Sequence, residues 1–232
     1  MEMMKSFFGY LIVAVSIVLF GWFIKTGMDN KTYSNRTISA RGVSERQVEA
    51  TIGVGQLYAS VYNDDLNQLK SITEEQIAQI ITFVKKYGFE DSEIEVISSI
   101  TDRHKDYVGD IKYRPVERYS SNFQVKILTN KTKELYNLQK NLGKLLDESG
   151  VLLDSNYFNY DYNDLSSVKP EMITEATVSA RESADRFAQD SNSKIGKIKY
   201  ANQGYFSIDP IEGVEPYILK VRVVVSVEFY LD

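Results

Sequence analysis

Apolar residues dominate one stretch near the amino terminus and alternate with polar residues along most of the remaining chain. Residues Phe7–Ile24 form a nearly unbroken apolar run directly behind Lys5. As a helix this run would be about 27 Å long, close to the roughly 30 Å hydrocarbon core of a bilayer. The pattern predicts a transmembrane signal-anchor at residues 7–25, after a short cytoplasmic tail (1–6) and before a linker (26–36).

A cleaved signal peptide is the main alternative for this run. Such peptides have a shorter apolar core, of about 7–15 residues, and a small-x-small cleavage site. The run instead ends in Trp22, Phe23 and Ile24 without such a site, so an uncleaved anchor is favoured. The positive charges that follow the run slightly favour a cytoplasmic domain, whereas so short a tail is typical of a signal-anchor that holds its domain outside. We expect a single-pass protein of the cell membrane with an extracytoplasmic C-terminal domain.

Residues 37–232 are predicted to form one α+β domain. Apolar residues recur at three- and four-residue steps in helical segments and at every second residue in strands. Because strands and helices do not alternate strictly, a mainly antiparallel sheet with three amphipathic helices packed on it is expected, preceded by the transmembrane helix. The expected helices lie at 66–87, 131–149 and from Pro170 onward; the expected strands lie at 37–43, 49–62, 93–101, 119–129, 151–162, 195–207 and 217–231.

Two of these segments have unusual patterns. The third helix carries alanine at every fourth position, a smooth ridge that allows close approach to a partner: Ala176, Ala180, Ala184 and Ala188. The last strand would span roughly 50 Å at about 3.3 Å per residue, which is long for a single domain. We therefore expect this strand to twist strongly, to bend at a bulge, or to pair beyond its own sheet.

Composition and motifs exclude several classes of function. The net charge of −5 with dispersed carboxylates argues against a nucleic-acid surface, and the absence of cysteine excludes disulfides and thiol chemistry. His104 is the only histidine, in a charged loop, and adjacent carboxylates such as Glu74 and Glu75 do not converge on a helix. An Asp- and Asn-rich stretch at 154–164 could offer oxygen ligands to Ca²⁺ but lacks EF-hand spacing. We expect no catalytic, metal or cofactor site, and thus no enzyme.

Aromatic residues supply the candidate interaction site. Their densest cluster lies at 157–162, where a strand would place Phe158, Tyr160 and Tyr162 on one face. Packing on the core is one interpretation, and a subunit interface is the other, because tyrosine combines a large contact area with a polar tip. The candidate interface residues are Tyr157, Phe158, Tyr160, Tyr162, Tyr217 and Phe229.

The domain resembles the SIMPL-domain family of exported or membrane-anchored bacterial proteins. The features that carry this resemblance are the strand pair Ile38–Gly42 and Thr51–Val54, the strand from Tyr119, the helix that ends at Gly150, and the alanine ladder that leads to Ile195-Gly196. The resemblance implies an α+β fold, an exported location, oligomerisation in some members and a loose association with envelope or oxidative stress. Biochemical activity is unsettled in the family.

These observations favour a membrane-anchored, extracytoplasmic module that assembles with itself or binds envelope proteins, with a stress-related role. The expected partners are the membrane, further copies of the chain and envelope proteins, and no nucleic acid. Two alternatives stay open at this point: an oxidant-protective protein and a small-molecule-binding sensor domain.

Overall fold

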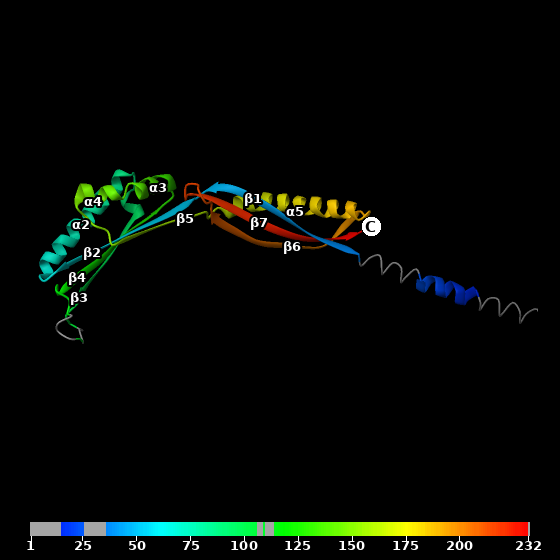
Figure 1. The fold of residues 1–232 in the computed structure, drawn as a ribbon, viewed down its shortest axis with the longest axis horizontal. Coiled ribbons are helices and arrows are strands. Elements are labelled where there is room, and N and C mark those ends of the chain that lie inside the picture. The colour runs from blue at the N-terminus through cyan, green and yellow to red at the C-terminus, as the bar shows by residue number, and fades with distance from the viewer. Residues whose placement is uncertain (1–14, 26–35, 106–108, 110–113, 232) are drawn as a thin grey trace, which may run out of the picture. The chain divides into compact units, whose positions relative to one another are not determined.

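The computed structural model describes residues 15–25, 36–105, 109 and 114–231, which form an α+β fold with two sheets (Figure 1). Residues 15–25 are helical. The elements that follow are β1 (Thr37–Glu49), β2 (Ile52–Asn63), α2 (Leu66–Lys86), the short 3₁₀ helix η1 (Asp91–Glu93), β3 (Ile94–Asp102), β4 (Tyr119–Thr129), α3 (Thr132–Lys140), α4 (Gly143–Ser149), β5 (Ser155–Asp161), α5 (Leu165–Asp190), β6 (Ile195–Pro210) and β7 (Ile218–Leu231).

The predicted transmembrane helix is wrong. Of the predicted span at 7–25, the structure describes only residues 15–25. Within the described ranges, no helix combines the length and the apolar character that crossing a bilayer requires. Residues 7–14, the tail at 1–6 and the linker residues 26–35 lie outside the described residues.

The chain divides into two compact units. Unit 1 consists of Met1–Glu45, Val168–Ser207 and Arg222–Asp232, and unit 2 of Arg46–Ser167 and Ile208–Val221. One sheet has the strand order β1-β7-β6 and lies mainly in unit 1; the other has the order β3-β4-β2-β5 and lies in unit 2.

The three-stranded sheet has β7 at its centre. Backbone hydrogen bonds join β7 to β1 near both ends, from Ala50 N to Tyr217 O (2.7 Å) and from Leu231 N to Arg36 O (2.9 Å), so the two strands run antiparallel. Alternate residues of β7 are buried, namely Leu219, Val221, Val223, Val225, Val227 and Phe229. The length of β7 is therefore matched by two long neighbours of its own sheet.

Helix α5 packs on this sheet through its alanine ridge. Ala176, Ala180 and Ala184 are completely buried. A Cβ atom added to Gly42 of β1 would lie 1.8 Å from the carbonyl oxygen of Ala176 and 2.4 Å from the amide nitrogen of Ala180. The backbones of helix and strand are thus in direct contact, which confirms the close approach that the alanine spacing predicts.

The four-stranded sheet is antiparallel and packs through larger side chains. Leu57 of β2 pairs with Val125 of β4, which pairs in turn with Val96 of β3. Helix α2 begins at a side-chain cap, because Asp65 accepts hydrogen bonds from the amides of Asn67 and Gln68. The fully buried core of this unit contains Leu57, Leu69, Ile80, Val84, Val125, Ile127, Leu135 and Leu138.

Two helix boundaries differ from the prediction. The helix expected at 131–149 is divided at Asn141 into α3 and α4. Helix α5 begins at Leu165 rather than near Pro170, which lies inside the helix. A tighter first turn, in which Ser167 N donates to Asp164 O at 3.2 Å, starts the helix before the proline.

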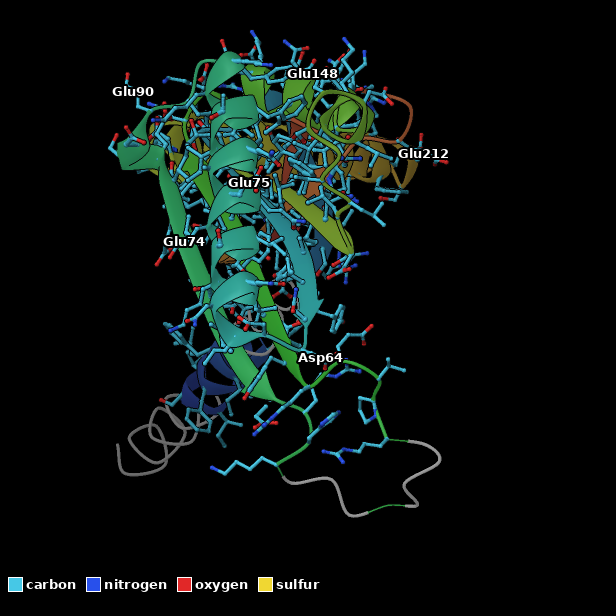
Figure 2. All side chains as sticks on the ribbon, turned by 90° about the vertical axis from the view of Figure 1, so that its left-hand side faces the viewer. Asp64, Glu74, Glu75, Glu90, Glu148 and Glu212 are labelled. Carbon is cyan, nitrogen blue, oxygen red and sulfur yellow. The ribbon has the colours of Figure 1, made fainter. Side chains whose placement is uncertain are left out.

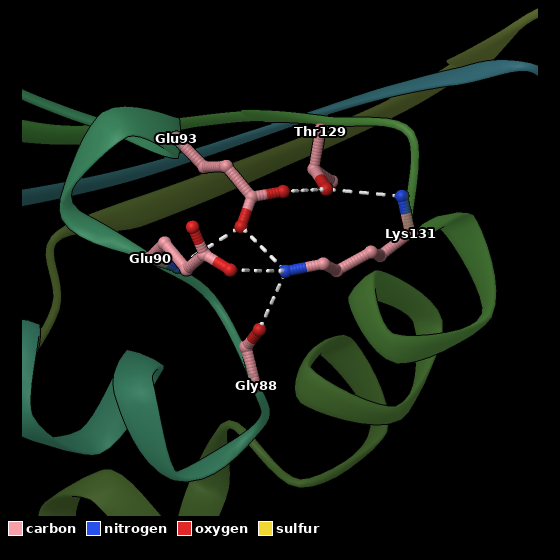
Figure 3. A network of polar contacts seen from close by, with 5 residues as sticks. All are labelled: Gly88, Glu90, Glu93, Thr129 and Lys131. Carbon is pink, nitrogen blue, oxygen red and sulfur yellow. Dashed lines mark hydrogen bonds and ion pairs between the residues drawn. The ribbon is translucent and has the colours of Figure 1, made fainter.

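A polar network joins η1 to the start of α3 (Figure 3). Lys131 Nζ donates to Gly88 O and to Glu93 Oε2, each at 2.8 Å, while the Thr129 hydroxyl donates to Glu93 Oε1 at 2.5 Å. Burial pushes the pKa of Glu93 upward, but the hydrogen bonds from Lys131, Thr129 and the Glu90 backbone hold it below its ordinary value. The same hydrogen bond with Glu93 raises the pKa of Lys131. The network connects the segment after α2 to the β4–α3 turn.

Candidate functional site

The groups considered for catalysis or metal binding lie apart from one another. His104 Nε2 donates to the carbonyl oxygen of Pro115 at 2.7 Å, so its ring is held by the backbone of its own loop. Figure 2 shows Glu74 and Glu75 on α2; Glu75 lines an open pocket together with Glu148, which is paired with Lys86. Among the residues that the structure describes, no group of three His, Cys, Asp or Glu could hold a metal ion.

Three of the six sequence-predicted interface residues are buried inside the chain. Phe229 is completely buried on β7, and Tyr160 and Tyr162 are buried at the end of β5 and just after it. The Tyr160 hydroxyl donates to Gln139 Oε1 at 3.0 Å, and burial raises the pKa of this phenol. Tyr160 and Tyr162 therefore pack in the core, which was the other interpretation of the aromatic cluster at 157–162, and Phe229 packs in the core on β7.

The other three candidates lie nearer the surface of unit 2. Tyr157 is 54% exposed, whereas Phe158 and Tyr217 are half-buried. The Tyr217 ring packs against the Tyr136 ring with centroids 5.7 Å apart. Of the sequence-predicted interface residues, Tyr157 alone presents most of its ring to solvent.

A cleft of about 460 Å³ lies between β5 and the segment that joins β6 to β7. This volume falls within the range of small-molecule sites, about 300–1,000 Å³. The cleft gathers aromatic, proline and amide side chains, among them Gln139, Phe158, Asn159, Tyr160, Pro210 and Pro216.

A further candidate site is the exposed edge formed by β6, which we call the β6 edge and define as residues 195–210. β6 is a continuous strand of 16 residues with a single strand neighbour, β7, in the described chain. Its side chains are exposed at 197–203, and Ile198 is 45%, Tyr200 61% and Tyr205 99% exposed. An edge strand presents backbone N–H and C=O groups that can pair with another chain.

The β6 edge is held firmly to its own sheet. Lys199 Nζ lies 3.2 Å from Glu228 Oε1 and 6.0 Å from the centroid of the Tyr230 ring, both on β7. A Cβ atom at Gly204 would lie 2.6 Å from the carbonyl oxygen of Val224, so only glycine allows the two backbones this approach. The free edge is therefore part of an ordered sheet rather than a loose segment.

The other three edge strands, β1, β3 and β5, are shorter than β6. β5 has 7 residues and buries Tyr160, and β3 has 9 residues, of which Glu95 and Asp102 are the ionisable ones. The fourth edge, β1, carries Arg41, Glu45, Arg46 and Glu49 along 13 residues. Charged side chains commonly protect edge strands against pairing, and β6 itself carries three along its 16 residues, Lys197, Lys199 and Asp209.

Sequence reasoning predicted β6 as a strand but missed its place at the edge. The signal was present in residues 197–203, where Ile198 and Tyr200 alternate with lysines but the alternation is lost at Ala201, Asn202 and Gln203. A strand that lacks a continuous apolar face is typical of the edge of a sheet, because neither of its faces is fully covered. The aromatic cluster at 157–162 was the stronger sequence pattern, and two of its four aromatic residues, Tyr160 and Tyr162, are buried.

Comparisons with known proteins give one informative match. The family model described as SIMPL, a protein of unknown function (DUF541), matches residues 38–229. A comparison with curated proteins gives no match.

Solved structures match only weakly. An uncharacterized conserved protein from Listeria innocua has 12% identity, with 82% of this chain and 92% of that chain covered and a TM-score of 0.24. A hydrolase from the same organism has 10% identity, with 89% and 98% covered and a TM-score of 0.25. An amidase of the hydantoinase/carbamoylase family from Burkholderia phymatum has 9% identity, with 57% and 33% covered and a TM-score of 0.24. The chain spans 29% of the length of a putative amidohydrolase/peptidase from Burkholderia cenocepacia, with a TM-score of 0.21. TM-scores this low support no conclusion about the fold or function of this chain.

Proposed function

Because this chain belongs to the SIMPL (DUF541) family, whose function is unknown, we propose that it is a protein-assembly module that associates with further copies of itself through the β6 edge. The observation that carries this proposal is the combination of length, order and exposure in one edge strand. The strand has 16 residues, is fixed to β7 by Lys199 and Gly204, and exposes Ile198, Tyr200 and Tyr205.

Pairing at this edge would supply both hydrogen bonds and apolar contact. Backbone groups of an edge strand exchange water for a partner strand at little cost in chain entropy, because the strand is already ordered. Tyrosine is enriched among the residues that contribute most to interfaces. Tyr200 and Tyr205 offer large rings with polar tips at a position where both are exposed to solvent.

The experiment that tests the proposal measures the mass of the full chain in solution. Size-exclusion chromatography with light scattering is run over a hundredfold range of concentration on the wild type, Tyr200→Asp and Val178→Asp. Val178 is an exposed apolar residue of α5 and serves as a matched control. The wild type and Val178→Asp are expected to exceed the monomer mass of 26.5 kDa, and Tyr200→Asp to approach it.

A monomeric wild type at every concentration would contradict the proposal, as would a Tyr200→Asp variant that assembles like the wild type. Association with other envelope proteins, an extracytoplasmic location and a stress-related role stay predictions. A topology reporter fused after Asp232 tests the location.

The cleft of unit 2 favours small-molecule binding as a second candidate function. Its Phe158 and Tyr160 rings and the Asn159 amide match a small planar ligand with a polar group. Saturation-transfer NMR with phenol as the probe is expected to show binding to the wild type and loss of binding in Asn159→Trp, which fills the cleft. An equal signal in both proteins would contradict this candidate.

A further inference from the structure

We propose that two copies of this chain pair antiparallel through β6 about a two-fold axis at Gln203, so that their three-stranded sheets become one six-stranded sheet. The inference rests on the proposed self-association and adds the partner strand, its direction and its register. The partner is a second copy because the sequence of β6 is complementary to itself when reversed.

The register follows from the side chains along β6. In a symmetric antiparallel pair with Gln203 opposite the partner's Gln203, Ile198 lies opposite the partner's Ile208. Tyr200 then lies opposite the partner's Phe206. Both pairs are apolar and each occurs twice by symmetry, and such directly opposed aromatic and β-branched residues stabilise sheets.

Charge complementarity selects the same register. The ionisable residues of β6 are Lys197, Lys199 and Asp209. With the axis at Gln203, Lys197 lies opposite the partner's Asp209, again twice. The register with its axis at Gly204 would instead bring Lys199 to that carboxylate, although Lys199 is already paired with Glu228, and would place Ile198 opposite Pro210.

The faces of the strand agree with this pairing. Lys169 of α5 lies 5.9 Å from the centroid of the Phe206 ring, which places Phe206 on the helix-covered face. The proposed pairing joins residues of equal parity, so helix-covered faces continue into helix-covered faces. A slip of one residue would turn every side chain of the partner to the opposite face.

The competing exposed edge, β3, is a weaker candidate for self-pairing. The ionisable residues within it, Glu95 and Asp102, are both acidic and are already paired with Lys126 and Arg118. Two copies of β3 would therefore gain no opposite charges within the strand. The charges and apolar pairs of β6 favour that strand instead.

The absence of cysteine from the natural chain allows a direct test of the register. In Gln203→Cys the two sulfurs face each other across the axis, at a Cα separation of about 4.5–5.5 Å that suits a disulfide. In Ala201→Cys or Tyr205→Cys the symmetric positions are about 13 Å apart along the strands, four residues at roughly 3.3 Å each. A mixture of these two variants again places one cysteine opposite the other.

The full-length variants are treated with a mild oxidant and, separately, with a bismaleimide short enough to span neighbouring strands only. We expect most of the Gln203→Cys protein, and the mixture of Ala201→Cys with Tyr205→Cys, to become covalent dimer. Ala201→Cys alone and Tyr205→Cys alone should each give at least fivefold less covalent dimer. Equal cross-linking at 201, 203 and 205, or none at 203 with both reagents, would overturn the register.

Charge reversal gives an independent readout. Lys197→Glu or Asp209→Lys alone is expected to weaken dimerisation about tenfold, because two cross-strand pairs change from attraction to repulsion. The double variant should recover most of the affinity. If the wild type assembles but the single variants show no loss and the double variant no recovery, the register is wrong and self-association is still supported. If the wild type is monomeric, both the register and self-association are wrong.

Discussion

The two sheets of this protein are covered by their helices in different ways. In unit 2, α2 and α3 place leucine, isoleucine and phenylalanine side chains over the four-stranded sheet, and the core contains Leu69, Ile80 and Leu135. In unit 1, helix α5 brings its backbone into contact with β1 at Gly42, where the facing residues of the helix are Ala176 and Ala180. In unit 2, large side chains separate the helices from the sheet, and we call this packing the thick cover. In unit 1, the helix backbone lies directly against the sheet, and we call this packing the thin cover.

This difference bears on how much of the face of β6 the helix covers. A helix with side chains is about 10–12 Å across, while three strands at roughly 4.8 Å spacing need a similar or greater width. Helix α5 packs its alanine ridge at Gly42 of β1, whereas Ile198 and Tyr200 of β6 remain exposed. Close packing at one side of a sheet thus leaves an accessible strand at the other.

The comparison predicts that the packing of unit 2 is destabilised most when a buried side chain loses volume. Ile80 is completely buried in α2, so Ile80→Ala removes methyl groups and leaves a cavity. The expected cost is about 4 kcal/mol in the free energy of unfolding, measured by urea denaturation. A loss below about 1 kcal/mol would show that this cover is loosely packed and would break the comparison.

The thin cover should instead be most sensitive to added volume. Gly42→Ala places a methyl group against the backbone of Ala176 and Ala180, which must move apart. We expect a loss of about 3 kcal/mol in unfolding free energy. Gly143→Ala in α4 is the control, because the added Cβ meets no atom within 4 Å, and it should be neutral or stabilising by up to about 1 kcal/mol. Equal effects of the two substitutions would contradict the close approach.

The polar network of unit 2 should make stability depend on pH. The pKa of Glu93 lies below its ordinary value of 4.5, so the charged form stabilises the fold above that pH. This stability is lost as the pH falls through the lower pKa of the folded state. Glu93→Gln should cost about 1 kcal/mol at pH 7 and flatten the fall in stability between pH 5 and 3. The measurement is the midpoint of urea denaturation at each pH. If this midpoint falls between pH 5 and 3 as steeply in Glu93→Gln as in the wild type, the role of the network is contradicted.

The smallest effect on stability is expected at the free edge. Tyr205 is 99% exposed, so Tyr205→Ser should change the unfolding free energy of the monomer by no more than about 0.5 kcal/mol. The same substitution should weaken self-association measurably in sedimentation velocity. Loss of stability without loss of association would place Tyr205 in the fold rather than in an interface.

Local patterns in the sequence predicted much of the fold. The alternation of Tyr119–Thr129 defines β4 with its observed bounds, and the spacing of Ala176 and Ala180 predicted a helix in close contact. The start of α5 was missed because the turn at Asp164 precedes the proline that marked the expected start. The transmembrane prediction rested on the length and hydrophobicity of the run at 7–24, and no helix among the described residues has the length and apolar character needed to cross a membrane.

The candidate site was harder to predict than the fold. Whether a tyrosine faces the core or solvent depends on strand order, which periodicity does not contain. Tyr160 and Tyr205 belong to similar aromatic-rich strands, yet the first is buried and the second fully exposed. Only the strand order of the two sheets reveals that β6 lies at an edge.

Hydrogen exchange measured by mass spectrometry at low and high protein concentration tests the central claim most directly. If β6 pairs with a second copy, peptides covering 195–210 should exchange at least tenfold more slowly at high concentration, while those covering 94–102 in β3 should not change. Exchange in β6 that is independent of concentration, or protection that appears in β3 instead, would contradict association through the β6 edge.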